Sequence, residues 1–125
     1  MPHILIVEDD AALDEVLRET LSGEHRCDAV TTVESALVLF RQKAYDLVIT
    51  DMSLPRGSGL QLLDEIRKAG GSTPVIVITG GSSGLSESAI RQLGATEYLL
   101  KPFNLPDIEA AVERAMTRHS DTSHT

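Results

Sequence analysis

The chain has 125 residues, which is the usual size of one domain that buries a core without disulfides. Its formal net charge of −8 disfavours direct binding to nucleic acids or anionic membranes, and its 3% aromatic content leaves no set of rings for stacking single-stranded bases. We expect a cytoplasmic protein, because the sequence has no apolar run that could cross a bilayer, no recognisable signal peptide and only one cysteine.

Apolar runs rich in β-branched residues alternate with segments of helical spacing along the chain. Five such strand–helix pairs predict a doubly wound α/β domain, with one parallel sheet covered by helices. The first strand is expected at residues 4–7, followed by a helix that Asp10 caps and Gly23 ends. The apolar face of this helix comprises Leu13, Val16, Leu17 and Leu21. The second strand, near residues 27–31, alternates apolar and polar residues, which is typical of an edge strand.

The middle of the chain contains the most apolar strands. Residues 46–50 predict the third strand, and a proline- and glycine-rich loop at 54–59 separates it from a helix that ends at Gly70–Gly71. Residues 75–78 are apolar at every position, which predicts a strand buried between two layers of helices. A short helix is expected at about residues 86–93.

The last strand–helix pair begins with a strand at residues 98–100. Asn104 is expected to cap the final helix, with Pro106 in its first turn. The apolar face of this helix comprises Leu105, Ile108, Val112, Ala115 and Met116. We expect the domain to cover residues 1–118 and residues 119–125 to form a polar, disordered tail.

Polar side chains follow four of the predicted strands. Glu8 and Asp9 follow the first, Asp51 the third, Thr79 the fourth and Lys101 the fifth. Ligands of an open, doubly wound sheet bind beyond the carboxyl ends of its strands, so these side chains should meet at one site. Three crowded carboxylates repel one another, and a hard divalent cation relieves that repulsion. With no histidine or cysteine cluster to favour Zn²⁺, the expected ion is Mg²⁺, with Mn²⁺ as the alternative.

A carboxylate beside such a metal can attack phosphorus and form an aspartyl phosphate. Asp51 is the best placed nucleophile, with Lys101 to pair with a phosphoryl oxygen and Thr79 to donate a hydrogen bond. Taken singly, each of these residues could be an ordinary loop, strand-end or surface residue. Their joint placement favours a site.

Four motifs together resemble the bacterial response-regulator receiver family over residues 3–118. They are the segments 4–10, 46–55, 77–80 and 98–103, which read ILIVEDD, DLVITDMSLP, VITG and YLLKPF. The resemblance implies a flavodoxin-like (βα)5 fold with sheet order 2-1-3-4-5, the strands being numbered along the chain. It also implies that the backbone carbonyl of Ser53 ligates the metal, that the Lys101–Pro102 bond is cis, and that Thr79 and Tyr98 form a switch. Tyr98 has the simpler reading of a core tyrosine with a wetted hydroxyl.

The same resemblance implies a phosphorylation switch rather than an enzyme, one that catalyses only its own phosphoryl transfer and dephosphorylation. A partner histidine kinase or phosphotransfer protein would phosphorylate Asp51 in a Mg²⁺-dependent reaction. The surface formed by the fourth helix, fifth strand and fifth helix would then change, act on a downstream output domain or protein, and offer a route to a homodimer.

Two positions depart from the family pattern. Ser58 stands where the family often has Asp, and Gly81 stands where many members carry a larger side chain. We hypothesise that the small Ser53 and Gly81 admit the attacking water and shorten the lifetime of the phosphorylated state.

Two other functions stay open from the residues alone. One is a Mg²⁺-dependent phosphohydrolase that turns over through an aspartyl phosphate, although such enzymes typically carry a second Asp where this chain has Ser53. The other is a flavodoxin-like cofactor carrier, although the chain has no Trp and only Tyr45 and Tyr98 as tyrosines.

Overall fold

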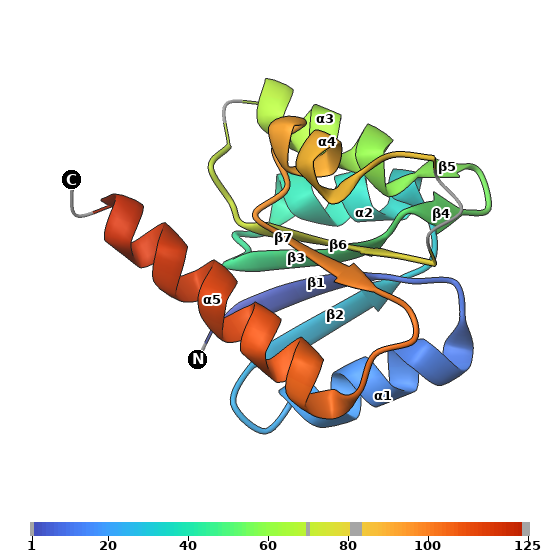
Figure 1. Cartoon of the computed structure of the whole chain (residues 1–125), viewed down its shortest axis with the longest axis vertical. Helices are drawn as coiled ribbons and strands as arrows, with labels where there is room; N and C mark the ends of the chain where they lie inside the picture. The colour runs from blue at the N-terminus through green and yellow to red at the C-terminus, as the bar shows by residue number, and fades with distance from the viewer. Residues whose placement is uncertain (1, 70, 81–83, 124–125) are drawn as a thin grey trace.

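A five-stranded parallel sheet forms the centre of the computed structural model, which describes residues 2–69, 71–80 and 84–123 (Figure 1). Its strands are β1 (His3–Val7), β2 (Arg26–Val30), β3 (Leu47–Asp51), β6 (Val75–Thr79) and β7 (Glu97–Leu100). Their order is β2-β1-β3-β6-β7, which confirms the predicted order 2-1-3-4-5 because β6 and β7 are the fourth and fifth strands of this sheet. The predicted loop between β3 and the next helix contains a small antiparallel hairpin, β4 (Ser53–Leu54) and β5 (Gly57–Ser58).

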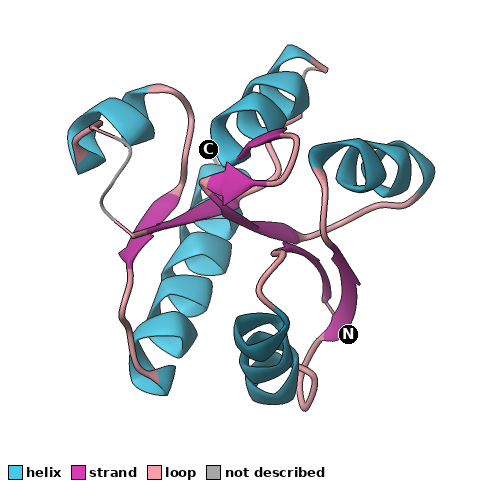
Figure 2. Ribbon diagram, turned by 90° about the vertical axis from the view of Figure 1, so that its right-hand side faces the viewer, coloured by secondary structure: helices cyan, strands magenta, loops and turns pink. Residues whose placement is uncertain are grey.

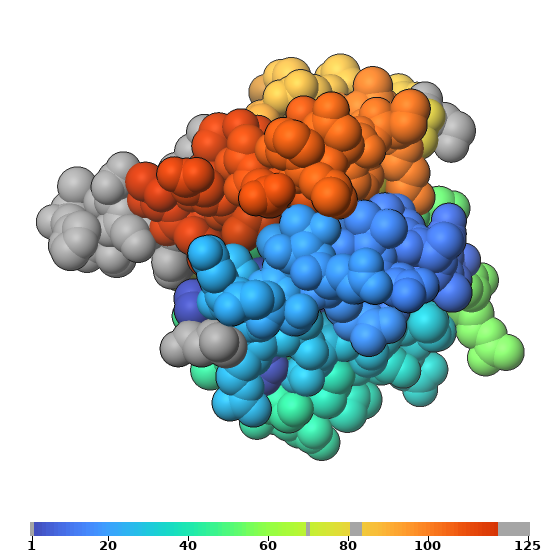
Figure 3. Space-filling view, turned by 90° about the horizontal axis from the view of Figure 1, so that it is seen from below, coloured from blue at the N-terminus to red at the C-terminus, as the bar shows by residue number. Residues whose placement is uncertain are grey.

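Five helices cover the two faces of the sheet. They are α1 (Ala11–Leu21), α2 (Val33–Gln42), α3 (Gly59–Lys68), α4 (Glu87–Gln92) and α5 (Leu105–Ser123). In Figure 1, α2, α3 and α4 lie above the sheet while α1 and α5 lie below it, and Figure 2 shows the same layers after a quarter turn. Figure 3, seen from below, shows α1 in blue and α5 in orange and red side by side. Asp10 and Asn104 accept hydrogen bonds from backbone amides of the first turn that follows each of them, as predicted for N-caps.

The core consists of two apolar clusters, one on each face of the sheet. Because side chains alternate along a strand, Leu5 and Val7 of β1 face α2 and α3, whereas Ile4 and Ile6 face α1 and α5. Every residue of β6 is buried, which confirms a strand between two helical layers. The strand β2 lies at an edge and is only partly buried, as its alternating sequence predicted.

Two apolar residues that helical spacing predicts in the core are exposed. Val16 is 39% exposed because the row that packs against the sheet is Leu13, Leu17 and Leu21, which lie four residues apart along one line of α1. Leu105 is 46% exposed because the packed row of α5 begins one turn later, at Ile108.

The helix α5 runs to Ser123, so the backbone of residues 119–123 is helical where the sequence predicted a disordered tail. No glycine or proline occurs between Asp107 and Ser123, and nothing in the local sequence therefore stops the helix. The remaining tail residues, 124–125, and the expected helix end at Gly70 lie outside the described residues. Within the part of the chain that the structure describes, no helix has the length and apolar character needed to span a bilayer.

Candidate functional site

The carboxyl ends of the central strands bring the predicted polar residues to one edge of the sheet. Asp51 is the last residue of β3 and Thr79 the last residue of β6, while Glu8 and Lys101 directly follow β1 and β7. The Lys101 amide donates to the Thr79 carbonyl over 2.8 Å and so continues the pairing of β6 with β7 by one residue. Parallel strands therefore place side chains from four parts of the chain together.

Asp51 lies at the centre of this group and is only 5% exposed. Its Oδ1 atom accepts a hydrogen bond from the Ser53 amide over 3.0 Å, and its Oδ2 atom accepts one from the Lys101 ammonium over 2.6 Å. Each oxygen of the Asp51 carboxylate is thus oriented by a hydrogen bond. Ser53, the residue whose carbonyl the resemblance assigns to the metal, is exposed at the start of β4.

Lys101 pairs with two carboxylates at once. Besides its contact with Asp51, its ammonium nitrogen lies 3.7 Å from Oε1 of Glu8. Burial works to lower the pKa of Lys101, but the hydrogen bond with Asp51 and the attraction of both carboxylates outweigh it and raise the pKa. The lysine is therefore a fixed positive charge at this site. The peptide bond between Lys101 and Pro102 is cis, as the family resemblance implied.

Glu8 is buried, and only one of its two carboxylate oxygens accepts a hydrogen bond within the described residues. Its Oε2 atom accepts a hydrogen bond from the Asp10 amide over 3.1 Å, whereas its buried Oε1 atom has no hydrogen-bond partner. Burial raises the pKa of Glu8 to about 7; the neighbouring Asp51 adds to this shift, while the Asp10 amide and Lys101 oppose it. A further positive group beside Oε1 would thus stabilise an ionised Glu8.

A divalent cation suits this arrangement. Oxygen atoms of Glu8, Asp9 and Asp51 all lie within 4.8 Å of one another, and Asp9, unlike the other two, is exposed. A hard cation that keeps several waters fits a site with oxygen ligands, a partly solvated edge and a buried carboxylate oxygen that accepts no hydrogen bond. These residues could therefore hold a metal ion.

Three other residues of the sequence analysis lie at the end of β6, on β7 and at the start of α3. Thr79 is buried at the end of β6. Tyr98 is half-buried on β7 and packs against the apolar cluster on the face covered by α2, α3 and α4. Ser58 caps α3 by accepting a hydrogen bond from the Gln61 amide over 3.1 Å, which gives this departure from the family pattern a structural role. Gly81 lies outside the described residues.

Sequence reasoning missed one residue that shapes the site. Gly59, the first residue of α3, lies so close to Asp51 that a Cβ atom at position 59 would collide with the Asp51 carbonyl oxygen. Its amide also donates to the Met52 carbonyl over 2.9 Å. The glycine-rich loop at 54–59 was the available signal, since an interior glycine often marks a close backbone approach.

Comparison with known proteins settles the family. The family model described as response regulator receiver domain matches residues 4–113. The chain belongs to this family. It is therefore a receiver domain of the type found in two-component response regulators, as the four motifs indicated.

Curated relatives include two transcriptional regulators. The receiver domain is 34% identical over 124 residues to the KDP operon transcriptional regulatory protein KdpE of Escherichia coli, covering 98% of this chain and 55% of that protein. It is 37% identical over 123 residues to the transcriptional regulatory protein PmrA of Pectobacterium parmentieri, with the same two coverages. The chain thus spans about half the length of these relatives.

Solved structures show the same fold. A response regulator receiver domain protein from Clostridium thermocellum superposes with a TM-score of 0.88 at 28% identity, covering 96% of this chain and 98% of that one. The non-phosphorylated HemR receiver domain from Leptospira biflexa superposes with a TM-score of 0.82 at 35% identity, covering 93% and 94%.

Proposed function

We propose that Asp51 accepts a phosphoryl group from a partner histidine kinase or phosphotransfer protein and that this modification switches the domain. The observation that carries the proposal is the carboxylate of Asp51, which is buried, held on both oxygens by Ser53 and Lys101, and placed beside Glu8 and Asp9. Because these contacts already fix the orientation of the carboxylate, less conformational entropy is lost when it attacks phosphorus in line.

In the proposed reaction an oxygen of Asp51 forms a bond to phosphorus while the phosphorus–nitrogen bond of the donor phosphohistidine breaks. The leaving imidazole takes up a proton, and an acyl phosphate is left on Asp51. Lys101, which now contacts the carboxylate at 2.6 Å, would pair with a phosphoryl oxygen, and the Thr79 hydroxyl would donate a hydrogen bond to another.

Glu8, Asp9, Asp51 and the carbonyl of Ser53 would hold Mg²⁺, or Mn²⁺ in its place. The ion would neutralise charge that develops on the phosphoryl oxygens. The Oε1 atom of Glu8 supports this assignment, because it accepts no hydrogen bond and the Lys101 ammonium, at 3.7 Å, only partly compensates the charge of an ionised Glu8.

The decisive experiment is incubation of the protein with acetyl phosphate and Mg²⁺. A stoichiometric, base-labile adduct on Asp51 would support the switch, and the Asp51→Asn variant should not form it. Rapid release of many equivalents of phosphate would instead favour the phosphohydrolase alternative. The family assignment and Ser53, in place of a second Asp, argue against that outcome.

We further propose that the signal leaves through the surface formed by α4, β7 and α5, once Thr79 and Tyr98 change position. This surface exposes Leu93, Leu100 and Leu105, which are 54%, 51% and 46% exposed. Such apolar side chains suit contact with an output domain, an output protein or a second copy of the chain. Molar mass measured with and without beryllofluoride, a phosphoryl analogue, would separate a homodimer from the other two.

We also propose that the small Ser53 and Gly81 admit the attacking water and shorten the lifetime of the phosphorylated state. Ser53 is small and exposed next to Asp51, which supports access of the attacking water. Gly81, the second residue of that hypothesis, lies outside the described residues. A lifetime that rises little when both residues are enlarged would argue against this part alone.

A further inference from the structure

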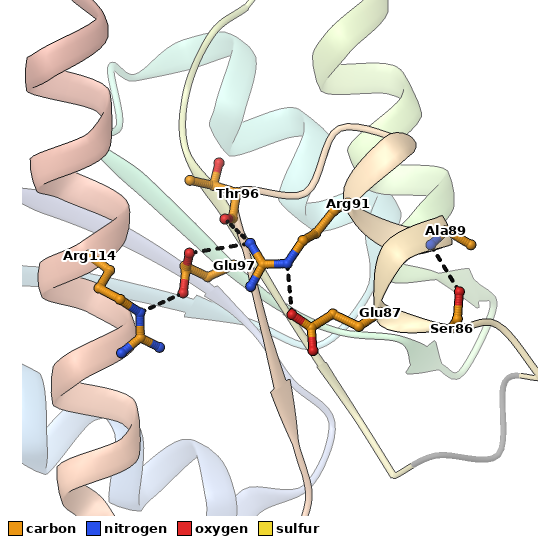
Figure 4. A network of polar contacts seen from close by, with 7 residues as sticks. All are labelled: Ser86, Glu87, Ala89, Arg91, Thr96, Glu97 and Arg114. Atoms are coloured by element: carbon orange, nitrogen blue, oxygen red, sulfur yellow. Dashed lines mark hydrogen bonds and ion pairs between the residues drawn. The ribbon is translucent and has the colours of Figure 1, made fainter.

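The carboxylate of Glu97 bridges two helices that lie on opposite faces of the sheet (Figure 4). Glu97 opens the edge strand β7 and is only 1% exposed. Its Oε1 atom accepts a hydrogen bond from Nε of Arg114 on α5 over 2.8 Å, and its Oε2 atom accepts one from Nη1 of Arg91 on α4 over 3.4 Å. Because β7 has no further strand beyond it, Arg91 can reach this carboxylate around the edge of the sheet.

The bridge is a buried charge that has a cationic partner on each of the two helices. Burial works to raise the pKa of Glu97, but the ion pairs with Arg114 and Arg91 outweigh it, and the pKa is lowered. The carboxylate therefore stays ionised between the two arginines, whose charges offset the cost of burying it.

The two arms of the bridge are unequal. The Arg114 arm is short, whereas the Arg91 arm, at 3.4 Å, is close to the limit for an ion pair with hydrogen-bond geometry. Arg91 also divides its donors, since it contacts Oε2 of Glu87 at 2.8 Å and the carbonyl of Thr96 at 2.9 Å. Of the two contacts with Glu97, the one from α4 is thus the easier to open.

The helices that carry these arms are also anchored to different degrees. The helix α4 has six residues and buries one side chain, Ile90. The helix α5 buries four apolar side chains against the sheet, namely Ile108, Ala111, Val112 and Ala115. We therefore expect α4 to move away from the sheet more easily than α5.

We propose that Arg91 and Glu97 form a latch that holds α4 in the arrangement seen here, and that the latch opens when Asp51 is phosphorylated. The inference rests on the proposed function of Asp51. Its physical basis is the strand β7, which begins at Glu97 and leads directly into Lys101, the residue that pairs with Asp51. Arg114 stays with Glu97 in both arrangements and keeps the buried carboxylate neutralised.

The test is the affinity for beryllofluoride in the presence of Mg²⁺, measured for the native protein and for two variants with the same charge change. Arg91→Gln removes the latch, so the analogue should bind about two- to fivefold more tightly, the range expected for one partly exposed ion pair. Arg114→Gln should lower stability without raising this affinity, because Arg114 is taken to pair with Glu97 in both arrangements. Equal affinities for Arg91→Gln and native protein, or an equal gain in Arg114→Gln, would overturn the latch.

Two further variants separate the latch from other roles of Arg91. Glu87→Gln removes the other carboxylate that Arg91 contacts and leaves the Glu97 contact in place, so it should not raise the affinity. In the Glu97→Gln background, Arg91→Gln should have no further effect on the affinity. An undiminished gain there would show that Arg91 acts through another partner.

Hydrogen exchange gives a readout that does not depend on phosphorylation. Arg91→Gln should speed exchange of the α4 amides, including that of Ile90, and leave α5 unchanged, whereas Arg114→Gln should affect α5. Unchanged exchange in α4 would overturn the latch. If the native protein bound no beryllofluoride, the proposed function of Asp51 would fail, and the exchange comparison would still decide whether Arg91 holds α4.

Discussion

The ammonium nitrogen of Lys101 lies 2.6 Å from Oδ2 of Asp51, although 50 positions separate the two residues in the sequence. The same nitrogen lies 3.7 Å from Oε1 of Glu8. One cation therefore compensates two buried carboxylates, so the charge balance of the site depends on Lys101.

Replacing Lys101 by Met should destabilise the protein by about 1–2 kcal/mol in the absence of Mg²⁺, because two buried carboxylates lose their cation. This loss is smaller than for a fully buried ion pair, since Lys101 is partly solvated. Added Mg²⁺ should restore part of the loss. Urea unfolding with EDTA and with Mg²⁺ measures both effects. The control is Lys68→Met, because Lys68 is exposed and its loss should leave the stability close to native. Equal effects of the two substitutions would contradict the role given to Lys101.

The stability of the metal-free protein should fall as the pH rises through the range set by Glu8. The pKa of Glu8 is raised from 4.5 to about 7, so the folded protein holds this proton more tightly than the unfolded chain does. The contribution is complete below the unfolded pKa and is lost as the pH rises through the folded pKa, a change of about 3 kcal/mol. Unfolding free energies in EDTA between about pH 5 and about pH 8 measure this slope.

The control for this pH dependence is Glu8→Gln, which removes the titrating group and should flatten the curve over the same range. Mg²⁺ should also reduce the slope, because a bound cation favours the ionised carboxylate. An unchanged slope in Glu8→Gln would assign the pH dependence to other groups.

Mg²⁺ affinity should depend on Asp9 and not on Asp10, although the two are neighbours. Asp9 belongs to the cluster of three carboxylates, whereas Asp10 caps α1 through its Oδ1 atom. Loss of a residue that only hydrogen-bonds to a metal ligand commonly weakens metal binding about 10- to 100-fold. Loss of a ligand, as in Asp9→Asn, should therefore weaken Mg²⁺ binding by at least about tenfold. Asp10→Asn changes the charge equally and keeps a good N-cap, so its affinity should stay close to native. Calorimetric titration with MgCl₂ measures both affinities. An equal loss of affinity in the two variants would indicate an effect of net charge rather than of coordination by Asp9.

Substitution of Gly59 by Ala should disturb Asp51 without touching any side chain of the site. The added Cβ would collide with the Asp51 carbonyl oxygen, which is backbone and cannot turn away. We expect a loss of about 1–3 kcal/mol in stability, together with slower labelling by acetyl phosphate. Gly23→Ala is the matched control, since a Cβ there meets no atom within 4 Å. Native stability in the Gly59 variant would show that the backbone of β3 gives way easily.

Much of this receiver domain could be predicted from local patterns. Alternating apolar runs and helical spacing predicted the strands, the helices and the two-sided burial of β6, because each pattern depends on residues close together in the chain. Glu8, Asp51, Thr79 and Lys101 stood out because the carboxyl ends of buried parallel strands are where such a sheet binds its ligands. The sheet order came from the family resemblance, and the structure confirms it.

Other features depend on how separate elements pack. Helical spacing placed Val16 and Leu105 in the core, but the packed rows of α1 and α5 leave both exposed. Two features of the site arise only when β3, α3 and the end of β1 are brought together. They are the close approach at Gly59 and the buried Glu8 oxygen that accepts no hydrogen bond.

The bridge at Glu97 shows the same limit. In the sequence, Arg91 and Arg114 are charged residues of two predicted helices, and Glu97 precedes the strand predicted at residues 98–100. None of the three stands out from the other charged residues. Their partners are chosen by the packing of α4 and α5 around an edge strand, which buries the carboxylate and leaves the arginines partly exposed. The sequence by itself determined the elements and the residues available for chemistry, because both are local properties. Tertiary structure decided which charges meet and which atoms lose contact with water, because those outcomes depend on distances between distant segments.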